Sequence, residues 1–355
     1  MNSKFQAALQ GRAQSTPPIW MMRQAGRYHR HYQKLRTEHG FMELCKNPKL
    51  AAEVALGPIE DFDFDVSILF SDLLFPLEAL GMGLDYDLGP PRLAFSLAPD
   101  SLKKLRSLDQ AIPGVEFQGD AVRETRRILP SNKSLIGFVG GPWTLLGYAV
   151  DGSHSGGLSK TKTLAPTLLP AFFEKLIPLL KANIQIQLQA GAEAVMILDT
   201  AAGELTALQW REWVLPSLQE LSQAHPHNEA KKVGYYMRGA TPEHWRILHE
   251  ERVRGTLNLA GIGFDAGISL EAQLLKNLAT PHAPLGFVQG NFHQEKMTLD
   301  SSAFESELER WLKPLQRLSP GDRRGWICGI GHGLTPQARE ENVRNFVQTV
   351  RRAFE

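Results

Sequence analysis

The alternation of short apolar runs with longer segments of helical periodicity most constrains the fold of this chain. Eight runs are rich in aliphatic, β-branched or aromatic residues. The predicted strands are residues 18–22, 66–71, 134–139, 194–199, 232–237, 255–260, 285–289 and 325–330. Continuous apolar strands are typical of a parallel sheet covered by helices. Eight strands alternating with helices predict a (β/α)8 TIM-type barrel, and a doubly wound open sheet is the alternative.

The spacing of apolar residues between these runs supports helices and one domain. Leu, Ile and Phe recur at three- and four-residue intervals through residues 163–191, which predicts a helix. No low-complexity tract or Pro/Gly linker interrupts the chain, and its 355 residues suit one α/β barrel. We therefore expect residues 1–355 to form a single barrel domain.

Composition excludes several classes of protein. The chain has 39 Lys and Arg against 38 Asp and Glu, whereas nucleic-acid binders usually carry a basic excess. Its two cysteines, Cys45 and Cys328, lack the spacing of a disulfide scaffold or zinc site. No apolar run has signal-peptide or transmembrane length. We expect a cytoplasmic protein with neither a nucleic-acid nor a membrane partner.

Positive charge is concentrated near the start of this nearly neutral chain. Residues 20–36 contain five Lys or Arg, two His and no acid. Arg23 and Arg27 are four residues apart, so they share one helix face or loop rim. Because guanidinium groups bind carboxylates in a bidentate manner, this pair indicates an anionic ligand; a solvated basic turn is the alternative. Arg30, Lys34 and Arg36 are expected at the surface.

Polar and glycine-rich segments follow most of the predicted strands. In a barrel, the carboxyl ends of the strands meet at one face, where active sites are built. We therefore expect five side chains to converge there with the basic stretch. They are Asp72, Tyr148, Thr200, Asn291 and His332.

Three of these side chains have a structural alternative. Asp72 follows an apolar strand, where it either stabilises a cation or caps a helix. Tyr148 lies one turn into a helix that follows a Gly-rich segment and either reaches the site or packs in the core. His332 has glycine on both sides and is either a site residue or a turn residue.

Acidic and histidine-rich stretches give no convincing metal site. Residues 60–65, "EDFDFD", are expected to form a solvated loop. The pairs His29/His31 and His225/His227 have a spacing seen in metal sites, but neither has an obvious third ligand. We expect no bound metal.

Taken together, the motifs resemble the uroporphyrinogen decarboxylase family over nearly the whole chain. The matching segments, in the family's order, are "MRQAGRY" (22–28), "ILFSDLL" (68–74), "ALGMG" (79–83), "IGFVGGPWTLLGY" (136–148), "DTAAGEL" (199–205), "VQGN" (288–291) and "GHGLTP" (331–336). The resemblance implies a single barrel that acts as a homodimer without a metal or organic cofactor. It implies uroporphyrinogen III, with eight carboxylates, as substrate and conversion of its four acetates to methyl groups.

The resemblance also assigns roles to residues. It implies that Arg23, Gln24 and Arg27 bind the substrate, with the arginines on its carboxylates. It implies substrate contact by Asp72, Tyr148, Thr200 and His332. The implied catalytic residues are Asp72, Arg23, Tyr148 and His332.

The implied chemistry begins with protonation of the pyrrole carbon that bears the acetate. The resulting cation accepts the electrons left when CO2 departs, and Asp72 would stabilise it electrostatically. Arg23, His332 and a bound water are all candidate proton donors.

The chain departs from the family pattern at five positions. His29 and Arg30 replace "LP", Ala201 and Ala266 each replace a Trp, and His293 replaces an Asp. A non-catalytic paralogue that binds porphyrinogens or other polyanions is therefore one alternative. A zinc- and corrinoid-linked methyltransferase of the same superfamily is another, although the cysteines lack a suitable ligand pattern.

Overall fold

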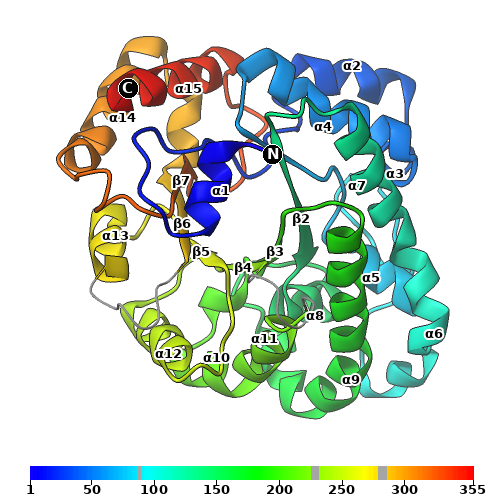
Figure 1. Cartoon of the computed structure of the whole chain (residues 1–355). Helices are drawn as coiled ribbons and strands as arrows, with labels where there is room; N and C mark the ends of the chain where they lie inside the picture. The colour runs from blue at the N-terminus through cyan, green and yellow to red at the C-terminus, as the bar shows by residue number, and fades with distance from the viewer. Residues whose placement is uncertain (87–88, 225–231, 279–285) are drawn as a thin grey trace.

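The computed structural model describes residues 1–86, 89–224, 232–278 and 286–355. It shows an α/β fold in which one parallel, curled sheet lies at the centre and helices surround it (Figure 1). Within these described residues the sheet has seven strands, arranged in chain order. They are β1 (Val66–Ile68), β2 (Ser134–Gly140), β3 (Ala194–Leu198), β4 (Val233–Tyr236), β5 (Gly261–Gly263), β6 (Phe287–Phe292) and β7 (Trp326–Ile330).

The helices follow the predicted alternation, and each pair of neighbouring strands is joined through at least one of them. Before β1 lie α1 (Ser3–Leu9), α2 (Arg30–Glu38), α3 (Phe41–Lys46) and α4 (Pro48–Phe62). Between β1 and β3 lie α5 (Phe75–Leu77), α6 (Leu108–Ala111), α7 (Glu116–Ile128), α8 (Pro142–Asp151) and α9 (Ser159–Gln189). The remainder are α10 (Ala207–Trp213), α11 (Leu215–Leu221), α12 (Pro242–Val253), α13 (Leu270–Leu278), α14 (Ser301–Gln316) and α15 (Glu340–Phe354). Short helical turns are η1 (Glu78–Met82), η2 (Pro99–Lys104), η3 (Ile112–Val115), η4 (Ala202–Glu204) and η5 (Gln294–Thr298).

The strand predicted at residues 255–260 is wrong. Strand β5 begins at Gly261, and the predicted run is the buried approach to it, with Leu257 and Leu259 almost inaccessible. The true strand has little side-chain signal because Phe287 fills the space beside it. A Cβ at Gly261 would lie 2.2 Å from the Phe287 ring.

The first predicted strand, residues 18–22, is reduced to one parallel bridge between Ile19 and Cys328. The Trp20 amide donates to the Cys328 carbonyl at 3.0 Å, and the Asp65 amide donates to the Ile19 carbonyl at 3.1 Å. This segment therefore contacts β7 on one side and the chain entering β1 on the other.

Helix α9 has the length and apolar composition of a membrane span, contrary to the expectation that no segment of the chain has these properties. Residues that a globular core would use share its buried face, including Leu168, Phe172 and Leu180. It packs against α7, α8 and β2. Because α9 makes these contacts, its apolar residues are explained by packing in the core.

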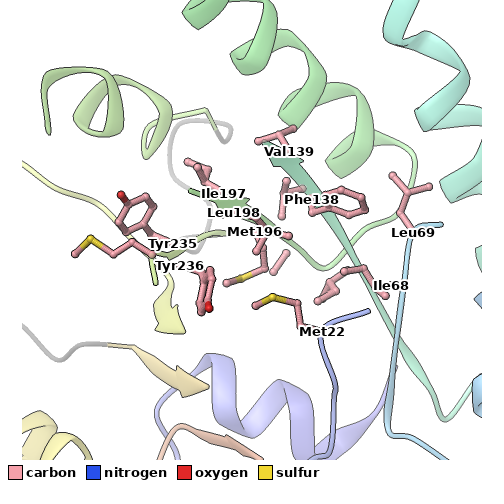
Figure 2. Packing of buried hydrophobic residues seen from close by; sticks show 14 of the residues in the cluster. Met22, Ile68, Leu69, Phe138, Val139, Met196, Ile197, Leu198, Tyr235 and Tyr236 are labelled. Atoms are coloured by element: carbon pink, nitrogen blue, oxygen red, sulfur yellow. The ribbon is translucent and has the colours of Figure 1, made fainter. Parts of the chain in front are cut away.

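Large side chains from the strands fill the centre of the sheet (Figure 2). Ile68, Phe138, Met196 and Tyr236 come from successive strands, and Met22 joins them from the N-terminal segment. Burial of apolar area on this scale is the main favourable contribution to folding.

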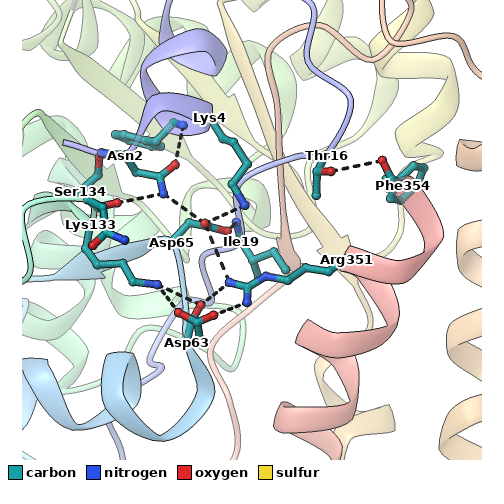
Figure 3. A network of polar contacts seen from close by, with 12 residues as sticks. Asn2, Lys4, Thr16, Ile19, Asp63, Asp65, Lys133, Ser134, Arg351 and Phe354 are labelled. Carbon is teal, nitrogen blue, oxygen red and sulfur yellow. Dashed lines mark hydrogen bonds and ion pairs between the residues drawn. The ribbon is translucent and has the colours of Figure 1, made fainter.

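An ion-pair network joins α1, the entry to β1 and α15 (Figure 3). Asp65 accepts from Lys4 Nζ at 2.9 Å and from the Ile19 amide at 2.9 Å, and its side chain is 4% exposed. Nearby, Asp63 pairs with Lys133 and Arg351. The expectation of a solvated loop at 60–65 is therefore wrong in two respects: residues 60–62 form the last turn of α4, and Asp65 is buried where the chain turns inward to enter β1.

Candidate active site

Side chains from the carboxyl ends of several strands gather around Arg23. This cluster, here called the strand-end cluster, consists of Arg23, Asp72, Tyr148, His154, Tyr236, Arg238 and His332. The positive charge of Arg23 acts to lower the pKa of every other member except Arg238. The structure thus brings together four of the predicted site residues.

Arg23 is held in an unusual backbone conformation. Its φ of 62° places it in the left-handed region, which non-glycine residues rarely adopt. A Cβ at Gly333 would lie 3.2 Å from Arg23 Cβ and Nε, so a larger residue after His332 would require this side chain to shift by a few tenths of an ångström. Such strained positions are often found at functional sites. Among the described residues, no carboxylate lies within 4 Å of the guanidinium.

Asp72 experiences opposing influences. Burial raises the pKa of its carboxyl, while the Tyr86 hydroxyl, the Leu74 amide and Arg23 oppose that rise. The Leu74 amide donates to Oδ1 at 2.9 Å. Tyr86 faces the carboxylate closely enough to act on its pKa, although its geometry falls short of an ordinary hydrogen bond. Asp72 is therefore a carboxylate in a restricted environment with a cation beside it.

Tyr148 lies on α8 and forms a hydrogen-bonded pair with His154. Its hydroxyl is 2.6 Å from His154 Nδ1, and the two rings stack with centroids 5.2 Å apart. Burial, followed by the charge of Asp72, raises the pKa of Tyr148 to about 12. Burial, followed by the charges of Arg23 and Arg238, lowers the pKa of His154. The phenol is therefore the donor and the imidazole the acceptor.

His332 is oriented by Tyr236 of β4. The Tyr236 hydroxyl donates to the Gly331 carbonyl at 2.8 Å and lies 3.1 Å from His332 Nδ1, with the rings nearly parallel. Since the Tyr236 hydroxyl donates its only proton to the Gly331 carbonyl, Nδ1 of His332 must carry a proton and donate it to the Tyr236 oxygen. Burial, followed by nearby positive charge, lowers the pKa of His332 to about 3. At neutral pH its Nε2 is therefore a lone-pair acceptor.

Two residues of the basic stretch differ in their surroundings. Gln24 is 1% exposed, and its amide donates to the Val66 carbonyl at 3.1 Å, which fixes the turn carrying Arg23 against β1. Arg27 is exposed, and no acidic group lies within ion-pair distance of it in the described part of the chain. Substrate contact by Gln24 and Arg27 stays a prediction.

Thr200 follows β3 and is half-buried, and its substrate contact also stays a prediction. Its neighbour Asp199 is fully buried and accepts from the Thr144 amide at 2.8 Å and the Thr144 hydroxyl at 2.7 Å. That hydroxyl in turn accepts from the Ala201 amide. A Cβ at Gly141 would lie 2.2 Å from Asp199 Cβ. The glycines before α8 therefore admit an internal carboxylate to the helix N-terminus.

Asn291 does not join the strand-end cluster. Its amide donates to the carbonyls of Asp265 and Ile268, both at 2.7 Å, and its oxygen accepts from Trp311 at 3.3 Å. It lines a cavity of about 280 Å³ between the loop after β5, the end of β6 and α14. The departures Ala266 and His293 line this same cavity, which none of the residues of the strand-end cluster lines.

Two further departures, His29 and Arg30, have side-chain partners. His29 is buried and lies 2.6 Å from Asp61, and Arg30 pairs with Glu340 at the start of α15. His31 packs against Gly57, and the pair His225/His227 falls outside the described residues. Within the ranges that the structure describes, no group of three His, Cys, Asp or Glu is arranged to hold a metal ion. Cys45 and Cys328 are both buried and unpaired.

Four residues of this region were not predicted from the sequence. His154, Tyr236 and Arg238 belong to the cluster, and Tyr86 faces Asp72. A signal existed for Arg238, since it follows the predicted strand 232–237 as directly as Asp72 follows its own. Tyr86 and His154 lie in loops that are many residues along the chain from the preceding strand, so sequence gives no such signal for them.

Comparisons with known proteins agree with the motifs. The sequence profile of the family described as "Uroporphyrinogen decarboxylase (URO-D)" matches residues 1–353. A protein named uroporphyrinogen decarboxylase from Ruegeria pomeroyi is 35% identical, with 98% of each chain covered. One of the same name from Rhodospirillum rubrum is 34% identical over 98% of this chain and 96% of its own. A solved methyltransferase from Methanosarcina mazei has a TM-score of 0.71, covering 100% of this chain and 99% of its own; at 17% identity it shows the fold alone.

Proposed function

The chain belongs to the uroporphyrinogen decarboxylase family and is a decarboxylase of haem biosynthesis, and we propose that it converts uroporphyrinogen III to coproporphyrinogen III at the strand-end cluster. The observation that carries this proposal is the placement of Asp72. One partly enclosed carboxylate lies beside a cation that has no ion-pair partner among the described residues. A site that only bound polyanions would gain nothing from a carboxylate at its centre.

The proposed reaction uses Asp72 to stabilise positive charge. Protonation of the ring carbon bearing the acetate gives a cationic pyrrole, CO2 leaves, and a second proton completes the methyl group. The carboxylate accepts hydrogen bonds from pyrrole N–H groups and interacts more strongly as the ring becomes cationic. An interaction that strengthens in the transition state accelerates the reaction, and such preorganised groups contribute several kcal/mol. Since the protonated ring is its own electron sink, the reaction needs no metal or organic cofactor.

The proposed donor of the ring proton is Arg23 or a water beside it. His332 is a poor general acid, because its pKa is lowered to about 3 and its proton at Nδ1 is engaged by Tyr236. Its Nε2 is suited to accept a hydrogen bond from substrate or water. Tyr148, whose pKa is raised to about 12 and whose proton is shared with His154, is suited to orient substrate.

We further propose that residues 18–21 occupy the eighth position of a (β/α)8 barrel. Their backbone bonds to Cys328 and Asp65 support this assignment. A cytoplasmic homodimer that contacts neither membrane nor nucleic acid completes the proposal, in keeping with the near-neutral net charge of +1.

Product analysis tests the proposed function. Purified, dialysed protein is incubated without oxygen with uroporphyrinogen III and EDTA, and porphyrins are separated by carboxylate number. We expect seven-, six-, five- and four-carboxylate species in turn. Binding without product would replace the enzyme with a porphyrinogen-binding paralogue. Loss of activity with EDTA that zinc restores would favour the methyltransferase alternative.

A further inference from the structure

Arg238 has no role in the reaction just described, yet it occupies a defined place at the end of β4. The loop after β3 packs directly on its backbone: a Cβ at Gly203 would lie 2.0 Å from the Arg238 carbonyl oxygen and 2.8 Å from the Ala240 nitrogen. The next residue, Gly239, donates its amide to Asp265 after β5. Three neighbouring strand-end loops therefore fix the base of this arginine.

The charge of Arg238 is not neutralised nearby. Its side chain is exposed, and in the described ranges no carboxylate lies within 4 Å of it. The two acids of the adjoining loops accept hydrogen bonds from backbone amides. Asp265 accepts from Gly239 and Gly267, and Glu204 accepts from Gly157 at 3.0 Å. The guanidinium fork is therefore available to an external anion.

His154 supplies a second donor beside this arginine. Its Nδ1 accepts the Tyr148 hydroxyl proton at 2.6 Å, so the neutral ring must carry its single proton on Nε2. Nε2 has no protein partner among the described residues and is not sealed from solvent. The loops that carry the two residues meet at residues 203–204, because Gly203 packs on the Arg238 backbone and Glu204 accepts from the Gly157 amide at 3.0 Å. The charge of Arg238 also acts on both His154 and His332. His332 presents the opposite tautomer, with Nε2 as acceptor, so it does not serve a carboxylate.

We propose that Arg238 and His154 form a second carboxylate-binding subsite that holds a propionate of the macrocycle. This subsite is separate from Arg23 and Arg27. This proposal rests on the proposed function, because that function supplies the macrocycle. A guanidinium fork with an imidazole N–H alongside is a donor set suited to a carboxylate.

The reaction itself favours a propionate over an acetate. A cation paired with the reacting acetate stabilises charge that disappears as CO2 leaves, so it opposes the reaction. Propionates persist through all four decarboxylations, so a fixed subsite can hold one in every intermediate. Asp72 follows β1, whereas Arg238 follows β4, three strands further along the sheet. Arg238 is therefore placed to anchor the ring away from the reacting position.

Kinetics with substrates of eight, seven, six and five carboxylates test this assignment. We expect Arg238→Gln to raise KM about tenfold for all four, with kcat within about twofold, because one charge-assisted contact is lost. Arg12→Gln is the matched control, since Arg12 is exposed, unpaired among the described residues and beside α1. His154→Phe keeps a stacked ring without the N–H and should raise KM, and His154→Gln should recover part of that loss.

The outcomes separate the subsite from the proposed function. A KM for Arg238→Gln within twofold of the wild type on every substrate, or a loss in kcat alone, would overturn the subsite. An effect that declines as acetates are removed would assign the contact to an acetate and overturn the propionate. Anaerobic fluorescence titration with uroporphyrinogen III gives Kd independently of turnover. If the wild type binds without turnover, the proposed function fails. The ratio of the Kd of Arg238→Gln to that of the wild type still decides the role of Arg238.

Discussion

At the scale of single residues, the surroundings of Asp72 suit a group that stabilises a cation it does not permanently contact. Burial pushes its pKa upward and favours the neutral acid, while Arg23, Tyr86 and the Leu74 amide favour the carboxylate. The pyrrole N–H groups of a bound substrate also favour the ionised carboxylate. The charge is thus retained where developing positive charge will strengthen its interaction.

Replacing Asp72 by Asn tests this electrostatic role. The amide oxygen of Asp72→Asn can still accept from Leu74, so the local turn should persist. We expect kcat to fall about 100-fold or more with a small change in KM, since a preorganised charge is lost mainly in the transition state. Asp120→Asn, on the exposed face of α7, is the control. A variant at position 72 that keeps more than a tenth of kcat would remove the role.

His332 predicts a pH dependence of stability. Its folded pKa is lowered to about 3 from the usual 6.5, chiefly by burial. Between these values the unfolded chain binds a proton that the folded chain does not, so stability falls as pH drops through this window. The contribution reaches about 1.4 kcal/mol per pH unit.

Urea unfolding of the wild type and His332→Gln at pH 7.5, 6.0 and 5.0 measures this effect. The stability advantage of the wild type should shrink as pH falls, because only the wild type contains the buried imidazole. Parallel curves for the two proteins would show that His332 titrates normally in the folded state.

At the scale of elements, the Gly-rich segment before α8 shows why sequence could not settle the site. Glycines before a helix favour the approach of an anion to its N-terminus. The anion in this structure is Asp199, which accepts from Thr144 and for which Gly141 leaves space. An internal carboxylate and an external ligand produce the same local sequence, and only the tertiary arrangement distinguishes them.

The ion-pair network around Asp65 also joins separate elements of the fold. Asp65 connects α1 through Lys4, the segment before β1 through Ile19, and α15 through Arg351. We expect Asp65→Asn to lower the free energy of unfolding by about 2 kcal/mol, because Lys4 loses its carboxylate partner and the buried Ile19 amide loses a charge-assisted hydrogen bond. The measurement is urea denaturation at neutral pH.

Asp63→Asn is a sharp comparison within the same network. The Asp63 side chain is 59% exposed, so its pairs with Lys133 and Arg351 are screened by water, and the expected loss is at most about 1 kcal/mol. Equal losses for the two variants would mean that burial of Asp65 adds nothing to its contribution.

At the scale of the whole molecule, strand alternation was enough to predict a parallel α/β fold, because apolar runs buried on both faces leave a continuous signal. The pattern failed where side chains of one strand fill the space of another. Gly261 of β5 has no side chain because Phe287 lies beside it, so the apolar approach at 255–260 appeared to be the strand. Register of this kind depends on packing across the sheet.

The site was predictable to the extent that the barrel rule applies. Asp72, Tyr148 and His332 follow strands and meet at Arg23, as parallel topology requires. Asn291 follows the predicted strand 285–289 but lies inside β6, and its side chain binds the loop after β5 and α14. Strand-end position therefore selects candidates, and side-chain direction, which sequence does not encode locally, decides among them.

The charge distribution of the molecule leads to a prediction about salt. The net charge is +1, so the far field attracts a polyanion weakly, whereas Arg23, Arg27 and Arg238 lack acidic partners within 4 Å in the described chain. Attraction is then local and is screened over roughly 10 Å at 0.1 M salt. We expect kcat/KM for the eight-carboxylate substrate to fall about tenfold between 20 and 300 mM NaCl, and less for the five-carboxylate intermediate.

Arg27→Ala tests whether the exposed Arg27 contributes to this local attraction of the substrate. Its deficit in kcat/KM relative to the wild type should be largest at 20 mM salt and should shrink as salt is added, because screening removes the interaction that the variant lacks. Arg12→Gln should follow the wild-type curve. If the Arg27→Ala deficit were independent of salt, Arg27 would face solvent without meeting substrate, and the basic stretch would contribute to binding through Arg23 alone.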